Sequence, residues 1–336
     1  MPAATPVSNT DSPRWQRELA EAVRDPAELL ALLDLDPALL PAARAAAAQF
    51  PLRVPRGFVA RMRPGDPHDP LLRQVLPLDE ELRPAAGFVA DPVGDLQAMA
   101  GHGVLHKYHG RVLLVATGAC AVHCRYCFRR HFPYAEANAA AGQWEAALRY
   151  IGSRPEISEV ILSGGDPLVL NDRRLSELAH ALADIPHLRR LRIHSRLPIV
   201  LPSRVDERLL DWLAGTRLSP VLVVHANHPH ELDAEVADAA ARLRARGVTL
   251  LNQTVLLAGV NDDPEVLIAL SERLFECGIQ PYYLHALDRV QGAGHFQADA
   301  ELPALMQALR ARLPGYLVPR PVREEPGQPA KTPLPY

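Results

Sequence analysis

The sequence contains little cysteine, no long apolar segment and no excess of charge of one sign. Only four of its 336 residues are cysteine, and three of these fall within eight residues, whereas a secreted disulfide scaffold spreads an even set of cysteines along the chain. No apolar run reaches the roughly 18 residues that a membrane-spanning helix needs. The Pro/Ser/Thr-rich start lacks the apolar core of a signal peptide, and a net charge of −3 creates no field directed at nucleic acid or a membrane. We therefore expect a cytoplasmic protein that binds neither.

From about residue 110 the sequence alternates between short apolar strands and amphipathic helices. The six strand candidates are Val112–Ala116, Val160–Leu162, Leu191–Ile193, Val221–Val224, Leu250–Val255 and Pro281–Leu284. Six successive βα units predict a parallel sheet, and six are fewer than the eight of a closed TIM barrel. The expected fold class is therefore α/β, with a partial, open (β/α)6 TIM-like barrel whose site lies at the carboxyl ends of the strands.

The rest of the sequence divides into segments of different composition. Residues 1–14 are expected to form a disordered N-terminus. Residues 15–104 are expected to form an extension that is helical at first and is then broken by prolines. The barrel is expected at residues 105–315, and residues 316–336 form a polar, Pro-rich end that composition alone would assign to disorder.

The clustered cysteines follow the first barrel strand in the pattern Cys120-x3-Cys124-x2-Cys127. Thiolates are the usual ligands of iron–sulfur clusters, which normally take four of them, so three leave one iron with an open position. A structural zinc site prefers four ligands, typically in two knuckles, and His123 lies inside the loop between the cysteines. Cys277, on a predicted helix, is interpreted as an ordinary buried thiol. The spacing therefore favours a [4Fe–4S] cluster with one open iron.

Polar residues lie at the ends of the other strands. Ser163, Gly164, Gly165 and Asp166 follow the second strand, and the two glycines would allow the backbone to approach a ligand closely. Polar clusters also end the third strand, His194-Ser195-Arg196, and the fourth, His225-Ala226-Asn227-His228, and Asn252-Gln253 lies in the fifth. Because the carboxyl ends of parallel strands meet at one edge of a sheet, these side chains predict a lined cavity.

The cysteine spacing, Tyr126 before the last cysteine and the position of the loop after the first strand resemble the radical S-adenosylmethionine (SAM) superfamily. Over nearly its whole length the chain also resembles the lysine 2,3-aminomutase family. In that family a C-terminal Lys-Thr-Pro carries the lysine that binds pyridoxal 5′-phosphate (PLP) covalently, and Lys331-Thr332-Pro333 matches it. The resemblance implies a [4Fe–4S] cluster, SAM and PLP as cofactors, conversion of L-lysine to β-lysine, and a C-terminal tail over the barrel mouth.

The resemblance also implies roles for individual residues. The phosphate of PLP would be held by Lys107 and Arg111, with Tyr108 between them, and SAM by the edge at Ser163–Asp166. Arg129 would bind the substrate carboxylate, and Asp288 and Glu324 would bind the side-chain ammonium. Glu324 stands where the family carries Asp, which keeps the charge and changes its reach.

Three stretches, which begin at Trp15, Leu105 and Cys127, resemble a shorter branch of the family, the elongation factor P β-lysylation aminomutases. That branch makes β-lysine for a ligase, which attaches it to the translation factor. The implied partners are L-lysine, an electron donor of the flavodoxin or ferredoxin type and, functionally, elongation factor P and its ligase. A homo-oligomer is compatible with the sequence.

Two alternative functions stay open from the residues alone. The first is a radical SAM enzyme that acts on another amino acid or without PLP. The second is a non-catalytic iron–sulfur electron carrier, in which Cys277 would have to supply a fourth ligand.

Overall fold

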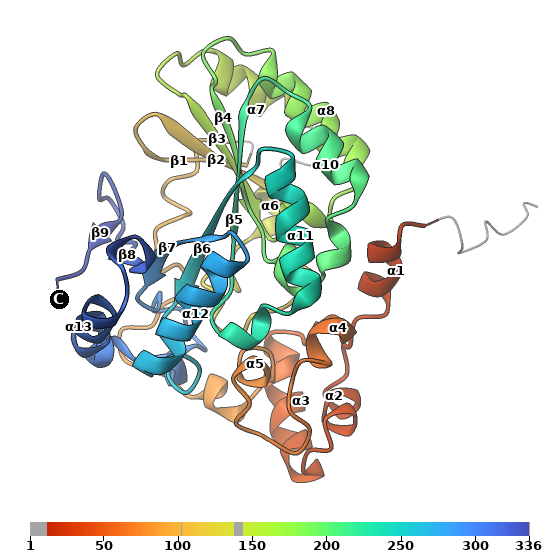
Figure 1. Ribbon diagram of the computed structural model, residues 1–336, viewed down its shortest axis with the longest axis vertical. Helices are drawn as coiled ribbons and strands as arrows, with labels where there is room; N and C mark the ends of the chain where they lie inside the picture. Colours follow the sequence, from red (N-terminus) through yellow and green to blue (C-terminus); the bar gives the residue numbers. More distant parts are fainter. Residues whose placement is uncertain (1–11, 102, 138–143, 336) are drawn as a thin grey trace, which may run out of the picture.

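The computed structural model describes residues 12–101, 103–137 and 144–335. Most of the segment expected to form a disordered start, residues 1–14, lies outside the described residues. The chain forms one twisted sheet with helices along its outer side, and most helices of the N-terminal extension lie at the lower right of the molecule in Figure 1.

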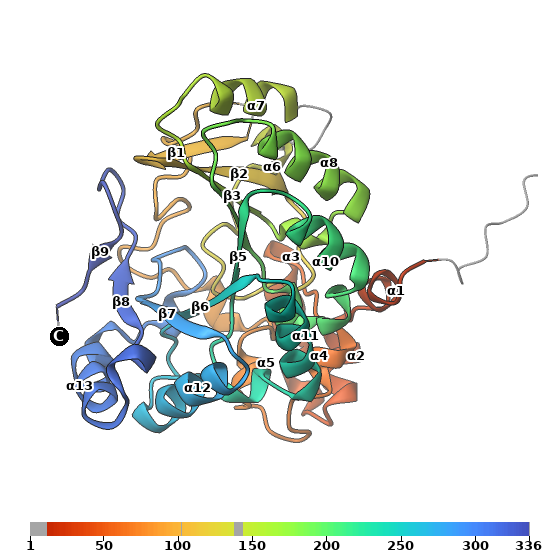
Figure 2. The same ribbon diagram turned by 45° about the horizontal axis from the view of Figure 1, so that its top comes forward.

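In the part of the chain that the structure describes, the sheet contains nine strands that pair in sequence order. Successive strands from β2 to β8 pair in parallel, while β1 and β9 pair antiparallel at the two edges. Figure 2 shows these edges at opposite ends of the curved sheet, so the barrel is open as predicted. The strands are β1 Val104–Tyr108, β2 Arg111–Thr117, β3 Glu159–Gly164, β4 Arg190–His194, β5 Ser219–Val224, β6 Thr249–Val255, β7 Gln280–His285, β8 Arg320–Arg323 and β9 Thr332–Pro333.

The six predicted strands correspond to β2–β7, and the structure adds a seventh parallel strand, β8. Its sequence, Arg-Pro-Val-Arg, is too short and too polar to show an apolar run. Its extended conformation depends on pairing with β7, in which Leu284 lies opposite Pro321. Sequence analysis therefore placed this strand in the C-terminal segment.

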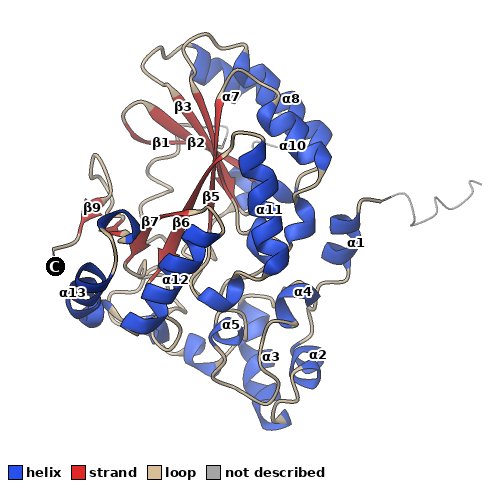
Figure 3. Ribbon diagram, in the orientation of Figure 1, coloured by secondary structure: helices blue, strands red, loops and turns tan. Residues whose placement is uncertain are grey.

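Helices connect the strands on the outside of the sheet, as Figure 3 shows by colour. On α8, Leu175, Leu178 and Leu182 recur at helical spacing and are buried against the sheet side. The barrel helices are α7 Trp144–Gly152, α8 Asp172–Ala183, α10 Glu207–Ala214, α11 Ala234–Ala245, α12 Pro264–Glu276 and α13 Leu302–Arg312, with two single turns at α6 Tyr134–Ala137 and α9 Leu197–Val200. Among the described residues, no helix is long and apolar enough to cross a membrane.

The N-terminal extension shares a core with the barrel. Trp15, Leu29 and Phe58 belong to the same continuous cluster of buried side chains as Leu162 of β3 and Leu209 of α10. The helices of the extension are α1 Arg14–Ala20, α2 Pro26–Leu32, α3 Leu40–Gln49, α4 Arg56–Val59 and α5 Pro70–Arg73. The domain boundaries proposed from composition stay a prediction.

The extension also holds the cysteine loop, residues 118–133, between β2 and α6. The carboxylate of Glu81 accepts hydrogen bonds from Arg125 at 2.7 and 2.5 Å and from Arg130 at 2.8 Å. All three side chains are almost fully buried. A buried charge is costly unless it is paired, so this triad fixes the loop against the extension.

Replacing Glu81 by Ala should lower the free energy of unfolding by about 3–5 kcal/mol, because Arg125 and Arg130 would remain buried without a carboxylate. Urea denaturation measures this change. The control is Asp79→Ala, which removes an exposed ion pair: the side chain of Asp79 is 51% exposed and that of Arg83 is 68% exposed. This substitution should lower the free energy of unfolding by less than about 1 kcal/mol. Equal losses in the two variants would contradict a structural role for Glu81.

Candidate active site

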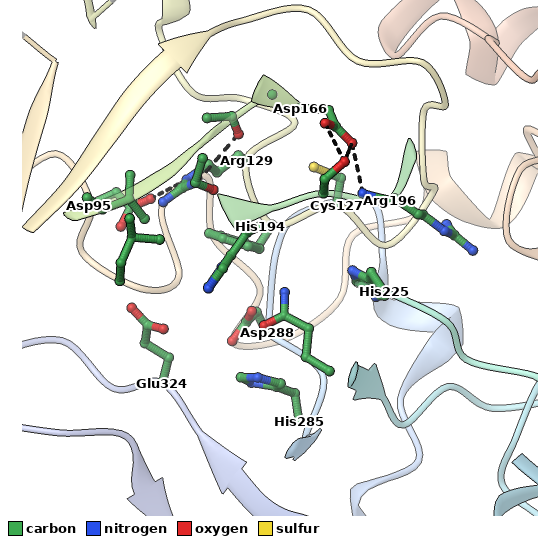
Figure 4. A pocket seen from close by; sticks show the side chains of 18 of the residues that line it. Asp95, Cys127, Arg129, Asp166, His194, Arg196, His225, His285, Asp288 and Glu324 are labelled. Atoms are coloured by element: carbon green, nitrogen blue, oxygen red, sulfur yellow. Dashed lines mark hydrogen bonds and ion pairs between the residues drawn. The ribbon is translucent and has the colours of Figure 1, made fainter. Parts of the chain in front are cut away.

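A cavity of about 370 Å³ lies inside the open barrel and reaches the carboxyl ends of its strands. Every site residue that was given an individual role from the sequence lines this cavity, whereas Asn227, His228 and Asn252 of the strand-end clusters do not. Figure 4 draws 18 of the lining side chains and labels ten of them. The predicted site residues that line the cavity are, in sequence order, Lys107, Tyr108, Arg111, Cys120, Cys124, Cys127, Arg129, Ser163, Gly164, Gly165, Asp166, His194, Ser195, His225, Gln253, Asp288, Glu324 and Lys331. Their common location is confirmed, whereas their individual roles stay predictions.

The three loop cysteines form one end of the cavity. Burial raises the pKa of the Cys127 thiol to about 11 and that of Cys120 well above its ordinary value. A cluster ligand must be a thiolate, so this end of the cavity needs positive charge. Arg196 supplies it, since its Nη1 donates to Sγ of Cys124 at 2.8 Å.

This donor set fits a [4Fe–4S] cluster with one open iron. Cys277 ends α12, packs in the hydrophobic core and does not line the cavity, so it supplies no fourth thiolate. Among the described residues, no three His, Cys, Asp or Glu side chains gather as ligands of a single metal ion.

Gly164 and Gly165 allow β3 to approach the backbone of the cysteine loop. A Cβ on Gly165 would lie 2.3 Å from the carbonyl oxygen of Ala119, and one on Gly164 would lie 2.5 Å from that of Thr117. The amide of Gly165 donates to the Thr117 carbonyl at 2.7 Å. The two glycines thus let β3 pack closely against the end of β2 and the cysteine loop, while the close approach to a ligand that the sequence suggested stays a prediction.

Asp166 and Ser195 are bonded to each other and to the backbone. Ser195 Oγ donates to both carboxylate oxygens of Asp166, at 2.8 and 3.0 Å, and the amides of Leu168, Arg196 and Leu197 donate to the same carboxylate. Burial raises the pKa of Asp166 although these hydrogen bonds oppose the shift. The pair joins the ends of β3 and β4 beside the cavity, and its contact with SAM stays a prediction.

Five charged side chains form a chain of alternating sign along the cavity. Arg129 Nε lies 2.6 Å from Asp95 Oδ2, and Asp95 Oδ1 lies 2.5 Å from Lys107 Nζ. Lys107 Nζ lies 2.8 Å from Glu324 Oε1, and Glu324 Oε2 lies 2.5 Å from Lys331 Nζ. Burial opposes ionisation of Glu324, but Lys331 and Lys107 hold its pKa well below the ordinary value. The extension, β1, the cysteine loop, β8 and the tail therefore meet through their charges.

Glu324 and Lys331 are neighbours because the C-terminal tail folds back on itself. β8 and β9 pair antiparallel, with Arg323 opposite Thr332. Glu324 directly follows β8, and Lys331 directly precedes β9. The turn between them contains Gly327 at φ 78°, a conformation that glycine adopts without strain. The tail is ordered by this pairing, although its composition alone favours disorder.

Only two of the 36 Lys and Arg residues in the sequence are lysine, and both contact Glu324. Lys107 Nζ has Asp95, Glu324 and the Val93 carbonyl as acceptors, which matches the three donors of an ammonium group. Arg111 instead lies over the ring of Tyr108 at 4.7 Å and makes no ion pair within the described ranges. Of the two cations expected to hold a phosphate, Arg111 is thus the one that the protein leaves unpaired.

Five buried polar atoms of residues on the cavity wall have no hydrogen-bond partner within the described residues. One is Arg196 Nε, and the other four are Tyr108 Oη, His194 Nε2, His285 Nε2 and Asp288 Oδ1. Burial raises the pKa of Asp288 to about 7 and lowers the pKa of both histidines well below the ordinary value. Because buried polar atoms are normally satisfied, these four indicate a polar ligand, and they fit PLP and an amino acid.

Sequence analysis missed several residues that line the cavity: Asp95, Tyr134, Arg192, Tyr283 and His285. Arg196, in the polar cluster at the end of the third predicted strand, lines the cavity as that cluster predicts. His285 follows a predicted strand, so the same strand-end rule could have found it. Asp95 lies in an irregular Pro/Gly-containing segment, where no periodicity marks a buried charge.

Comparison with known proteins agrees with this geometry. The family model described as "Radical SAM superfamily" matches residues 114–270. The chain is 51% identical to the L-lysine 2,3-aminomutase of Escherichia coli (strain K12) over 95% of its own length and 94% of that protein. It is 49% identical to the L-lysine 2,3-aminomutase of Haemophilus influenzae, with the same coverage of both chains. Among solved structures, a radical SAM methyltransferase from Sphaerobacter thermophilus matches 66% of this chain and 68% of its own with 19% identity and a TM-score of 0.43, below the level at which a shared fold follows.

The open parallel barrel with three thiols at its carboxyl edge is that of a radical SAM enzyme. Within this class the chain belongs to the lysine 2,3-aminomutase family, a family of isomerases. Membership implies a [4Fe–4S] cluster, SAM and PLP as cofactors.

Replacing Gly165 by Ala should remove most of the iron that the protein binds on anaerobic reconstitution, because the new methyl group would displace the cysteine loop. Iron and sulfide analysis measures this loss. Gly152→Ala at the end of α7 is the control, since no atom lies within 4 Å of its added Cβ. Full iron content in the Gly165 variant would show that the loop tolerates the displacement.

Proposed function

We propose that this protein converts L-lysine to β-lysine with PLP attached covalently to Lys331, and that the product is used to modify elongation factor P. The alternating chain of charges that ends at Lys331 carries the proposal for substrate and cofactor. Covalent attachment of PLP needs an amine, and the protein sequence contains two lysines. Lys107 has all three donors engaged, whereas Lys331 lies on the tail with Glu324 as its one acidic partner within the described residues.

The charges of the site complement those of L-lysine. Arg129 uses Nε and Nη1 to bind Asp95 and Ser163, and the structure records no partner within the described residues for Nη2, which can donate to a carboxylate. Glu324 and Asp288 offer carboxylates for an ammonium group. In this structure Glu324 already binds the ammonium groups of two lysine side chains, Lys107 and Lys331.

Substrate binding then exchanges one ion pair for another. When Lys331 is attached to the cofactor, its ammonium no longer neutralises Glu324, and the side-chain ammonium of the substrate can take its place. No buried charge is left unpaired by this exchange, which avoids the large penalty of an isolated buried ion. Glu324, longer than Asp by one methylene, also keeps contact with Lys107 on its other oxygen.

When bound, the cofactors would supply the hard chemistry, the cluster and SAM a radical and PLP an aldehyde and a π-system. Arg129 and the two carboxylates would hold the two ends of the substrate. Water would be excluded by the β8–β9 hairpin, which borders the cavity with Glu324 and Lys331, and by apolar lining residues, among them Leu105, Ile161 and Leu287.

The link to elongation factor P rests on the resemblance of the stretches beginning at Trp15, Leu105 and Cys127 to that branch of the family. Coexpression with elongation factor P and its ligase tests it. The intact mass of the translation factor should increase by one β-lysyl group only when this protein is active. Modification that does not depend on this protein would reject the link.

Lys331→Ala should abolish β-lysine formation by enzyme reconstituted anaerobically with iron, sulfide and PLP and supplied with dithionite, SAM and L-lysine. Mass spectrometry after derivatisation measures the product. Borohydride reduction and peptide mapping should place PLP on Lys331 in the parent enzyme and in a Lys107→Arg control. A label on Lys107 would contradict the assignment, and 5′-deoxyadenosine without β-lysine would leave the radical SAM chemistry standing but reject the substrate.

The kcat/KM for L-lysine should increase as the pH rises through about 7. Burial raises the pKa of Asp288 to about 7, so this carboxylate becomes able to bind an ammonium only above that pH, while Glu324 is already ionised. Because kcat/KM reports groups of the free enzyme, its pH profile measures the effect. Asp288→Asn should lower kcat/KM and remove this limb of the profile, and an unchanged limb in that variant would exclude Asp288 as its source.

A further inference from the structure

A buried arginine to which the sequence gave no individual role contacts the cysteine loop. Arg196, which follows β4, is 5% exposed, and its Nη1 donates to Sγ of Cys124 at 2.8 Å. Its backbone amide donates to Asp166 Oδ2 at 2.8 Å, which fixes the start of the side chain. In Figure 4 Arg196 lies at the side of the cavity near Asp166 and Cys127.

Other groups hold the guanidinium of Arg196 in one orientation. Nη2 donates to Glu231 Oε2 at 2.9 Å and to Gln74 Oε1 at 2.6 Å. The rings of Phe58 and Tyr126 lie 5.5 and 5.8 Å from its central carbon. One edge of the planar group is therefore held by the protein interior, and Nη1 is left to face the sulfur.

Glu231 is fully buried and its carboxylate is completely engaged. Oε1 accepts hydrogen bonds from Gln74 Nε2 and from the amides of Asn227 and His228, and Oε2 accepts the one from Arg196. Burial opposes ionisation of Glu231, but Arg196 and these hydrogen bonds hold its pKa below the ordinary value. The charge that Glu231 contributes is thus fixed on the side of Arg196 away from Cys124.

A buried ion pair of this kind does little for stability, because desolvation of both charges offsets their attraction. Its consequence here is an oriented field. The cation touches the thiol and the anion lies behind it, so the sulfur experiences net positive potential. Hydrogen bonds to the sulfurs and nearby charge are among the factors that set the reduction potential of an iron–sulfur cluster.

We infer that Arg196 is a positioning residue that stabilises the reduced state of the cluster through Cys124, and that Glu231 and Gln74 hold it there. Reduction adds one electron to the cluster while a one-electron donor of the flavodoxin or ferredoxin type is oxidised, so the total charge at the sulfurs becomes more negative by one. Arg196 favours that state without giving up a proton. This inference rests on the cluster and not on the identity of the amino-acid substrate.

The test is an EPR-monitored redox titration of the reconstituted enzyme without SAM or lysine. The double variant Arg196→Gln/Glu231→Gln removes the donor and the cation and leaves no unpaired charge. Its reduction should be at least tenfold less favourable, which for a one-electron couple is a midpoint at least 59 mV lower. Glu231→Gln alone leaves the charge of Arg196 uncompensated and should shift the midpoint in the opposite direction, to a higher potential.

The two variants are expected to shift the midpoint potential in opposite directions. A purely structural role of Arg196 would not produce this pattern, because loosening of the cysteine loop would not raise the midpoint in one variant and lower it in the other. The control is Arg204→Gln/Asp172→Asn, which removes an ion pair between the buried Arg204 and the partly buried Asp172, 2.7 Å apart. This pair does not line the cavity, so its removal should leave the midpoint unchanged. If the Arg196 double variant binds no iron, the inference is tested by the direction in which Glu231→Gln shifts the midpoint potential.

A parent-like midpoint in an iron-replete double variant, or a downward shift in Glu231→Gln, would overturn the inference. Because no lysine is present, these results are independent of whether the enzyme makes β-lysine.

Discussion

Five charges share one buried cavity, and each is neutralised by its neighbour along the chain Arg129, Asp95, Lys107, Glu324 and Lys331. A charge removed from water is tolerated only when it is paired, so no member of this chain can be placed without the others. The five residues come from the cysteine loop, the extension, β1, the end of β8 and the tail. The open barrel therefore needs its extension and its tail to complete the site.

The same requirement explains how such a site can accept an amino acid with a charged side chain. Arg129 and Glu324 are neutralised in the structure by Asp95, Lys107 and Lys331, so their binding to a substrate would proceed by exchange of partners. A cavity with unpaired charges would have to bear their desolvation cost before the substrate arrived. The β8–β9 hairpin carries two of the five charges, Glu324 and Lys331. The segment that borders the cavity therefore also contributes to its charge balance.

Buried charge also organises the cysteine loop from two sides. Glu81 holds Arg125 and Arg130 against the extension, and Glu231 holds Arg196 against Cys124. On a third side, Gly164 and Gly165 let β3 contact the loop backbone directly. The thiols are thus placed by interactions that lie outside the cysteine motif, which explains why a motif of eight residues is insufficient to form the site.

Much of the barrel could be predicted because its central strands are apolar runs between helices with polar caps. The strands β2–β7 satisfy this pattern, and side chains at their carboxyl ends, such as His194 and His225, were found for that reason. β8 could not be found, since Arg-Pro-Val-Arg becomes a strand only by pairing with β7. Asp95 could not be found either, because nothing local distinguishes a buried aspartate in an irregular segment from an exposed one.

The sequence by itself determined the parallel α/β fold, the three thiols and, through Lys331-Thr332-Pro333, the amine that the family requires, because each depends on residues close together in the chain. Only the tertiary structure decided how the charges are paired. In the folded chain all three donors of Lys107 have acceptors, whereas Arg111 has no ion pair among the described residues. Asp95 lies between Arg129 and Lys107, and Arg196 contacts Cys124. These contacts join residues 12 to 217 positions apart, and their formation depends on which charges the folded chain buries together.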